Sequence, residues 1–155
     1  MRDPAYDRVP TEHLARGAGV IALAAVAIIH VLDLPDTLPD MPLIGAGYFV
    51  LIAAALATST LLMTVPGPRI WMLADLIGTG AITAYVLSRT IGLPTDTADI
   101  GNWNCALGIA ALSTEALIVL LAAWRMQPRR SRGAADYRAS RYPIPKITTS
   151  ADSSH

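Results

Sequence analysis

Hydrophobic side chains are concentrated in four long stretches, separated by short polar segments rich in proline, glycine and aspartate. The stretches cover about residues 17–34, 43–65, 70–91 and 104–126. A helix of about 20 residues, rising about 1.5 Å per residue, crosses a hydrocarbon core of about 30 Å. The pattern therefore predicts an all-α membrane protein with four transmembrane helices.

The composition agrees with this interpretation. Hydrophobic residues make up 53% of the chain and charged residues 15%, against about 25% charged residues in an ordinary soluble domain. The 12 basic and 12 acidic residues balance, which gives no indication of a nucleic-acid partner. A single cysteine, Cys105, cannot form an intrachain disulfide. No CxxC or HExxH motif is present, and we predict no cofactor.

The polar segments define the connections. Residues 33–42 hold three prolines and three aspartates and no Lys or Arg, and we expect a tight, rigid, acidic loop there. Short connections at 66–69 and 92–103 complete an antiparallel up-down bundle. Residues 1–16 form a polar leading segment. Residues 127–155 form a basic tail with too few apolar residues to fold alone, so we expect it to be mostly disordered.

The distribution of positive charge predicts the orientation. Eleven of the twelve Lys and Arg residues lie in the leading segment, at Arg69 or from Arg125 onward, and the two other loops have only Arg89. By the positive-inside rule both termini are cytoplasmic. Three tryptophans are expected at the membrane interfaces, two on the inside and one on the outside: Trp71, Trp124 and Trp103. We therefore predict a multi-pass protein of the plasma membrane.

Glu115 lies near the middle of the fourth predicted helix, where an isolated carboxylate costs several kcal/mol. Gly108, Ala111 and Ala122 share its helical face, and small residues there allow another helix to approach closely. We expect Glu115 to face the bundle interior and to have a partner. Two roles stay open: a proton or cation relay, and a polar group that only joins helices.

Asp75 lies about one and a half turns into the third helix. Hydroxyl side chains of the second helix fall at a similar depth: Thr58, Ser59 and Thr60. Together with Glu115 they could form a polar layer in the inner half of the bundle. Alternatively, Asp75 pairs with an arginine near the cytoplasmic interface: Arg16, Arg69 or Arg125.

Arg89 closes the third helix on the outer side. It follows Asp75 by fourteen residues, about 21 Å along a helix, so the two cannot pair. Acids of the outer loops are its expected partners: Asp33, Asp36, Asp96 and Asp99. We expect a salt bridge that fixes these loops to the bundle. The alternative is a docking or anion contact on the outer face.

His30 is the one histidine within a predicted span, about one turn before the outer end of the first helix. Asp33 follows at i+3, and this spacing of imidazole and carboxylate can hold a metal. His30 and Asp33 are therefore the metal candidates of the chain. The alternative for His30 is a hydrogen bond within the bundle.

Several short segments resemble a family of small four-helix membrane proteins from actinobacteria. The resembling positions are His30, Pro35-Asp36, Asp40, Gly45, Gly47-Tyr48-Phe49, Tyr85 to Pro94, Leu107-Gly108 and Glu115-Ala116-Leu117. The resemblance covers about residues 20–122 and implies a topology but no reaction. Members of that family often carry a second histidine after the proline and acid of the first loop, where this chain has Thr37.

Three classes of function fit these observations. The first is an accessory or assembly subunit of a larger membrane complex, because no segment outside the spans is large enough for a catalytic site. The second is a small oligomeric proton- or cation-coupled carrier that uses Glu115 and Asp75 and requires subunit symmetry. The third is a metal-binding membrane protein that uses His30. The expected partners are the lipid bilayer and a membrane protein or a second copy.

Overall fold

The computed structural model describes residues 8–94 and 97–127, with side chains from residue 11 onward. In this part of the chain four α-helices follow one another: α1 (Arg8–Asp40), α2 (Pro42–Thr64), α3 (Pro68–Thr90) and α4 (Ala106–Met126). Each helix is long and apolar enough to cross a membrane. The prediction of an all-helical protein with four candidate membrane spans is confirmed.

The first helix is much longer than the sequence suggested. It begins at Arg8, within the expected leading segment, and continues to Asp40 through the expected acidic loop. Pro35 and Pro39 lie inside it, and both are exposed. A proline in a helix removes one hydrogen bond and crowds the preceding turn, yet local helical geometry continues here around a buried Thr37. The expectation of a loop over residues 33–42 is therefore corrected.

The connections between the first three helices are very short. Only Met41 separates α1 from α2, and Leu38 packs so closely that a Cβ on Gly45 would lie 2.6 Å from its Cδ1. Proline occupies the first turn of both α2 and α3, where a missing N–H costs nothing. Gly67, with φ of 135°, reverses the chain between them in a conformation that favours glycine.

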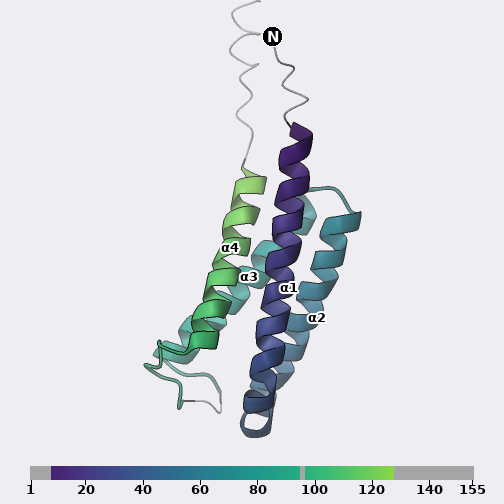
Figure 1. Cartoon of the computed structure of the whole chain (residues 1–155). Coiled ribbons are helices and arrows are strands. Elements are labelled where there is room, and N and C mark those ends of the chain that lie inside the picture. The colour runs from purple at the N-terminus through teal and green to yellow at the C-terminus, as the bar shows by residue number, and fades with distance from the viewer. Residues whose placement is uncertain (1–7, 95–96, 128–155) are drawn as a thin grey trace, which may run out of the picture.

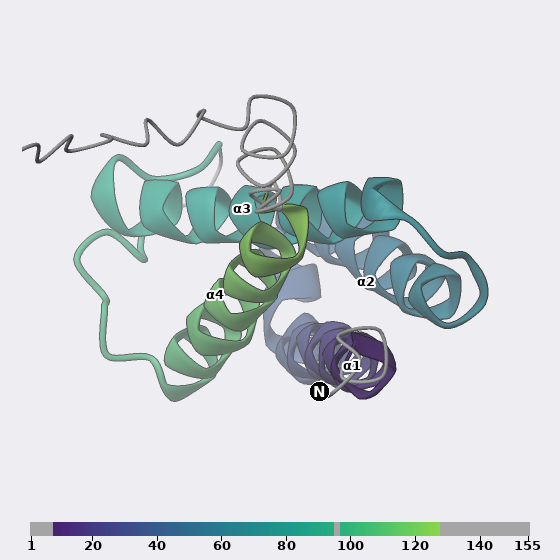
Figure 2. The same ribbon diagram turned by 90° about the horizontal axis from the view of Figure 1, so that it is seen from above.

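The four helices form two pairs that diverge toward one end. α1 packs mainly against α2, and α3 packs mainly against α4, while α1 and α4 join the pairs. Figure 1 shows the start of α1 and the end of α4 at the same end of the molecule. Seen from above, α3 and α4 cross each other at a steep angle, and α1 lies beside α2 (Figure 2). Contacts between α2 and α3 are the sparsest of these pairings.

The close-packed core occupies the end of the bundle at which α1 starts. Its members include Leu23 and Val26 of α1, Leu62 of α2, Trp71 of α3 and Ala122 of α4. Trp71, in the first turn of α3, is 4% exposed, so its ring packs inside the bundle and does not face outward. Its ring packs against the backbone of α1 at Gly19. Trp103 and Trp124, by contrast, are exposed.

The structure does not describe residues 1–7, Thr95, Asp96 or residues 128–155. The predicted disordered tail therefore lies outside the described residues, apart from Gln127.

Candidate functional site

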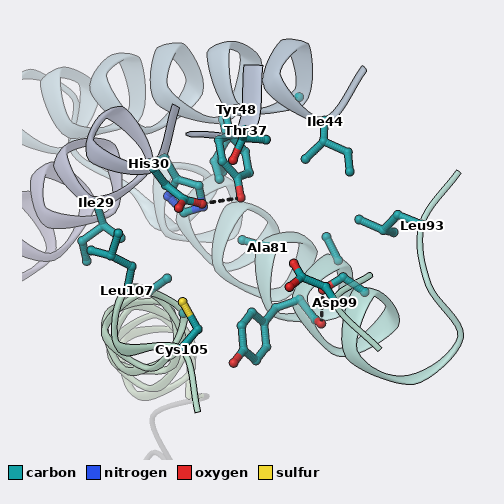
Figure 3. A pocket seen from close by; sticks show the side chains of 18 of the residues that line it. Ile29, His30, Thr37, Ile44, Tyr48, Ala81, Leu93, Asp99, Cys105 and Leu107 are labelled. Carbon is teal, nitrogen blue, oxygen red and sulfur yellow. Dashed lines mark hydrogen bonds between the residues drawn. The ribbon is translucent and has the colours of Figure 1, made fainter. Parts of the chain in front are cut away.

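A cavity of about 520 Å³ lies at the open end of the bundle, opposite the close-packed core. All four helices contribute to its wall, together with Leu93 and Asp99 of the loop between α3 and α4. Figure 3 shows His30, Thr37 and Tyr48 on one side of it and Leu107 and Cys105 on another. Its size falls within the range of about 300–1,000 Å³ that small-molecule sites occupy. The cavity can therefore hold a ligand.

Two titratable side chains from different helices meet at this cavity. Glu115 of α4 is 1% exposed and His30 of α1 is 8% exposed. The imidazole Nε2 lies 3.9 Å from the Glu115 carboxylate Oε1. Oε2 of Glu115 is buried and has no hydrogen-bond partner among the described residues. Glu115 is thus a buried carboxyl group whose nearest titratable partner is His30.

The second nitrogen of His30 fixes its tautomer. Nδ1 lies 2.9 Å from the backbone carbonyl oxygen of Val26, and because a carbonyl can only accept, Nδ1 must donate. In the neutral ring Nε2 is then an acceptor directed toward Glu115. A separation of 3.9 Å exceeds a hydrogen bond but leaves space for one intervening donor or acceptor atom. Glu115 and His30 can therefore bind one proton or one donor group between them.

This pairing differs from the polar layer that the sequence suggested. His30 lies at the depth of Glu115 because α1 continues ten residues beyond it, to Asp40. The expected position of His30 one turn from the end of its helix is corrected. Asp75 is half-buried and does not line the cavity. The hydroxyl residues of α2 are also outside the cavity wall: Thr58 and Ser59, both buried, and Thr60, which donates to the Leu56 carbonyl oxygen.

The expected ion pairs of Asp75 are not formed either. No hydrogen bond or ion pair joins the Asp75 carboxylate to another residue that the structure describes. Two of the arginines expected to pair with Asp75 instead share Glu12. Nη2 of Arg16 lies 3.0 Å from Glu12 Oε1, and Nη2 of Arg125 lies 3.6 Å from the same oxygen. Arg69 is exposed. Because Glu12 lies on the added first turns of α1, the longer helix supplies the acid that replaces Asp75.

A second polar contact lies one turn beyond His30. The Tyr48 hydroxyl of α2 donates to Asp33 Oδ2 of α1 at 2.8 Å, and the dashed line in Figure 3 marks this bond. The Tyr48 ring meets the His30 ring edge-on, with centroids 4.8 Å apart. Thr37 is buried and lines the same cavity. The α1–α2 wall therefore presents a continuous row of polar groups to the cavity.

The opposite wall contains Arg89, which is 8% exposed although it lies in the last turn of α3. It forms an ion pair with Asp99, and its guanidinium carbon lies 4.9 Å from the centroid of the Tyr85 ring. The Gly101 amide also donates to the Arg89 carbonyl oxygen at 2.9 Å. Of the four acids expected to pair with Arg89, the structure therefore selects Asp99. Asp96, one of the four, lies outside the described residues.

The backbones of α3 and α4 approach closely beside Glu115. A Cβ on Gly78 would lie 3.0 Å from the Glu115 carbonyl oxygen and 2.9 Å from Cγ2 of Val119. On the same face of α4, Ala111 and Ala122 are buried, and Gly108 lies against the Tyr85 ring. Small residues on both helices therefore allow the crossing that buries Glu115.

Each metal candidate has a hydrogen-bond partner of its own. His30 and Asp33 are engaged by different partners, Val26 and Tyr48. Among residues 8–94 and 97–127 no group of three or more His, Cys, Asp or Glu side chains could hold a metal ion. Cys105 is half-buried and lines the cavity without a disulfide.

Sequence reasoning singled out Glu115, His30 and Arg89 but not the cavity that they share. Tyr48 and Tyr85 were missed as site residues, although each is a polar aromatic side chain within a predicted span. Comparison of the chain with protein-family models, curated proteins and solved structures gives no match. The resemblance to the actinobacterial membrane family therefore stays a prediction.

Proposed function

We propose that this protein binds a small molecule in the cavity between its four helices, with the Glu115–His30 pair as the central polar contact. The observation that carries the proposal is a buried carboxyl group with an unpartnered oxygen in the wall of a cavity of about 520 Å³. Buried polar groups without partners are costly, and a bound ligand would supply the missing hydrogen bond. The sequence-based carrier hypothesis paired Glu115 with Asp75, and the present proposal pairs Glu115 with His30 instead.

The proposal places the protein in the plasma membrane with both termini in the cytoplasm. The support is the excess of arginine near the start of α1 and the end of α4. The part of the cavity wall formed by Asp99 and Met41 then lies toward the outer face. A ligand would enter from the outside or laterally from the outer leaflet, and a second copy of the chain would be needed to form a complete transport path.

An accessory or assembly subunit of a larger membrane complex is the second candidate. Its support is the apolar surface that the bundle leaves uncovered, including Phe49, Val50, Leu56 and Met63 along α2. Lipid covers such a surface equally well, so the surface alone does not distinguish the two candidates. Co-purification does.

The test is purification of the full chain from its own membranes in mild detergent, followed by native mass spectrometry. Two glycine substitutions provide a matched pair, Gly47→Leu and Gly17→Leu. A Cβ at either position meets nothing within 4 Å, but only Gly47 lines the cavity. We expect an adduct of small-molecule mass on the wild-type protein and on Gly17→Leu, and its loss in Gly47→Leu.

A stoichiometric partner protein without a small-molecule adduct would favour the accessory-subunit candidate instead. An adduct that survives Gly47→Leu unchanged would place the ligand elsewhere and refute the cavity as the site.

A further inference from the structure

The cavity has an excess of negative charge. Four acidic side chains line it against a single arginine: Asp33, Asp36, Asp99, Glu115 and Arg89. The charge of Arg89 is already balanced by Asp99, and its guanidinium lies over the Tyr85 ring, although its buried Nε has no hydrogen-bond partner among the described residues. The three remaining carboxyl groups make the cavity electrostatically suited to a cation.

Among these acids, Glu115 is the buried one whose carboxylate lacks a hydrogen-bond partner. Asp33 accepts from Tyr48, and Asp36 is exposed, whereas Glu115 is 1% exposed and its Oε2 has no partner within the described chain. His30 stands 3.9 Å away, too far for a direct hydrogen bond. A ligand N–H placed between them would donate a hydrogen bond to the carboxylate. A positive charge on the ligand would also balance the negative charge of the buried carboxylate.

The remaining wall is apolar and spacious. Aliphatic side chains line it from three helices: Ile29, Ile44, Leu51 and Leu107. Gly47, Gly80 and Ala84 leave space between them. A bare metal ion would occupy a small part of about 520 Å³ and would lack a ligand set among the described residues. The ligand must therefore bring its own apolar body.

We infer that the cavity binds a small organic monocation, an amine on an apolar or aromatic body, whose ammonium N–H donates to the Glu115 carboxylate. The body lies along the aliphatic wall. This inference rests on the proposed ligand-binding function and names the chemical class of its ligand.

The test uses three probes of similar size and different charge: 2-phenylethylamine, 2-phenylethanol and phenylacetate. Each is titrated calorimetrically into the full chain in nanodiscs of zwitterionic phosphatidylcholine, and empty nanodiscs correct for partitioning into lipid. We expect the amine to bind about 10-fold or more tightly than the alcohol, as a charge-assisted hydrogen bond requires. Phenylacetate should bind most weakly.

Two charge-removing substitutions test whether Glu115 causes the preference for the amine. Glu115→Gln keeps the shape of the side chain and should abolish the preference for the amine. Asp75→Asn removes another acid from a span, but one outside the cavity, and should leave the preference intact. If Glu115→Gln does not fold, Gly47→Leu serves instead, because it fills the cavity from an open position and should abolish binding of the amine.

Several results would overturn the inference. Equal binding of amine and alcohol, both lost in Gly47→Leu, would refute the cation class while the ligand-binding function stands. A preference for the amine that persists in Glu115→Gln, or disappears in Asp75→Asn, would refute the role of Glu115. Absence of binding by all three probes would also refute the inference, and if native mass spectrometry then finds no adduct, the proposed function falls with it.

Discussion

The substitution Gly78→Ala should destabilise the bundle where α3 and α4 approach closely beside Glu115. An added Cβ would meet Cγ2 of Val119 at 2.9 Å and the carbonyl oxygen of Glu115 at 3.0 Å. Both distances are shorter than ordinary van der Waals contacts, and the second partner is backbone, which cannot rotate away as a side chain can. The two helices must therefore move apart.

The magnitude follows from two opposing effects. Overpacking of a tight contact costs about 1–3 kcal/mol, while replacing glycine by alanine within a helix gains about 0.5–1 kcal/mol. We expect a net loss of about 1 kcal/mol for Gly78→Ala, near the middle of the range that these two effects leave. Gly80→Ala is the matched control two residues later in α3, because a Cβ there meets nothing within 4 Å. It should be neutral or slightly stabilising.

The assay is reversible unfolding by sodium dodecyl sulfate in mixed micelles, followed by circular dichroism. Gly78→Ala should unfold at a lower detergent fraction than the wild type, and Gly80→Ala should not. Identical unfolding curves for the two variants would refute the close approach of α3 and α4 beside Glu115. If α3 and α4 move apart in Gly78→Ala, Glu115 also becomes less buried. The close contact of the two helices therefore contributes to the candidate site.

Two further substitutions test the polar contacts at the open end. Arg89→Ala leaves Asp99 without its partner and should cost about 2 kcal/mol in the same assay, less than a fully buried pair because the Asp99 side chain is 33% exposed. Exposed Arg69→Ala is its control and should change stability by less than about 0.5 kcal/mol, so equal effects would contradict the ion pair. Tyr48→Phe removes the 2.8 Å hydrogen bond to Asp33 and should cost about 1–3 kcal/mol, whereas an unchanged unfolding curve would show that the bond contributes nothing.

The sequence by itself determined the four apolar helices and the small-residue face around Glu115. Both properties are local: a span depends on the length and polarity of one continuous segment, and a helical face depends on the 3.6-residue period. The buried positions Ala111, Glu115 and Ala122 follow that period. No partner helix has to be known to derive them.

The tertiary structure alone decided which polar groups meet. His30 reaches Glu115 because α1 passes through Pro35 and Pro39 to Asp40, whereas those prolines taken in isolation favour a loop. Arg89 had several acids of equal chemistry within its neighbourhood, and the fold of the α3–α4 loop selected Asp99. Pairing depends on the length, rotation and divergence of separate helices, and these quantities arise from packing that the one-dimensional pattern does not contain.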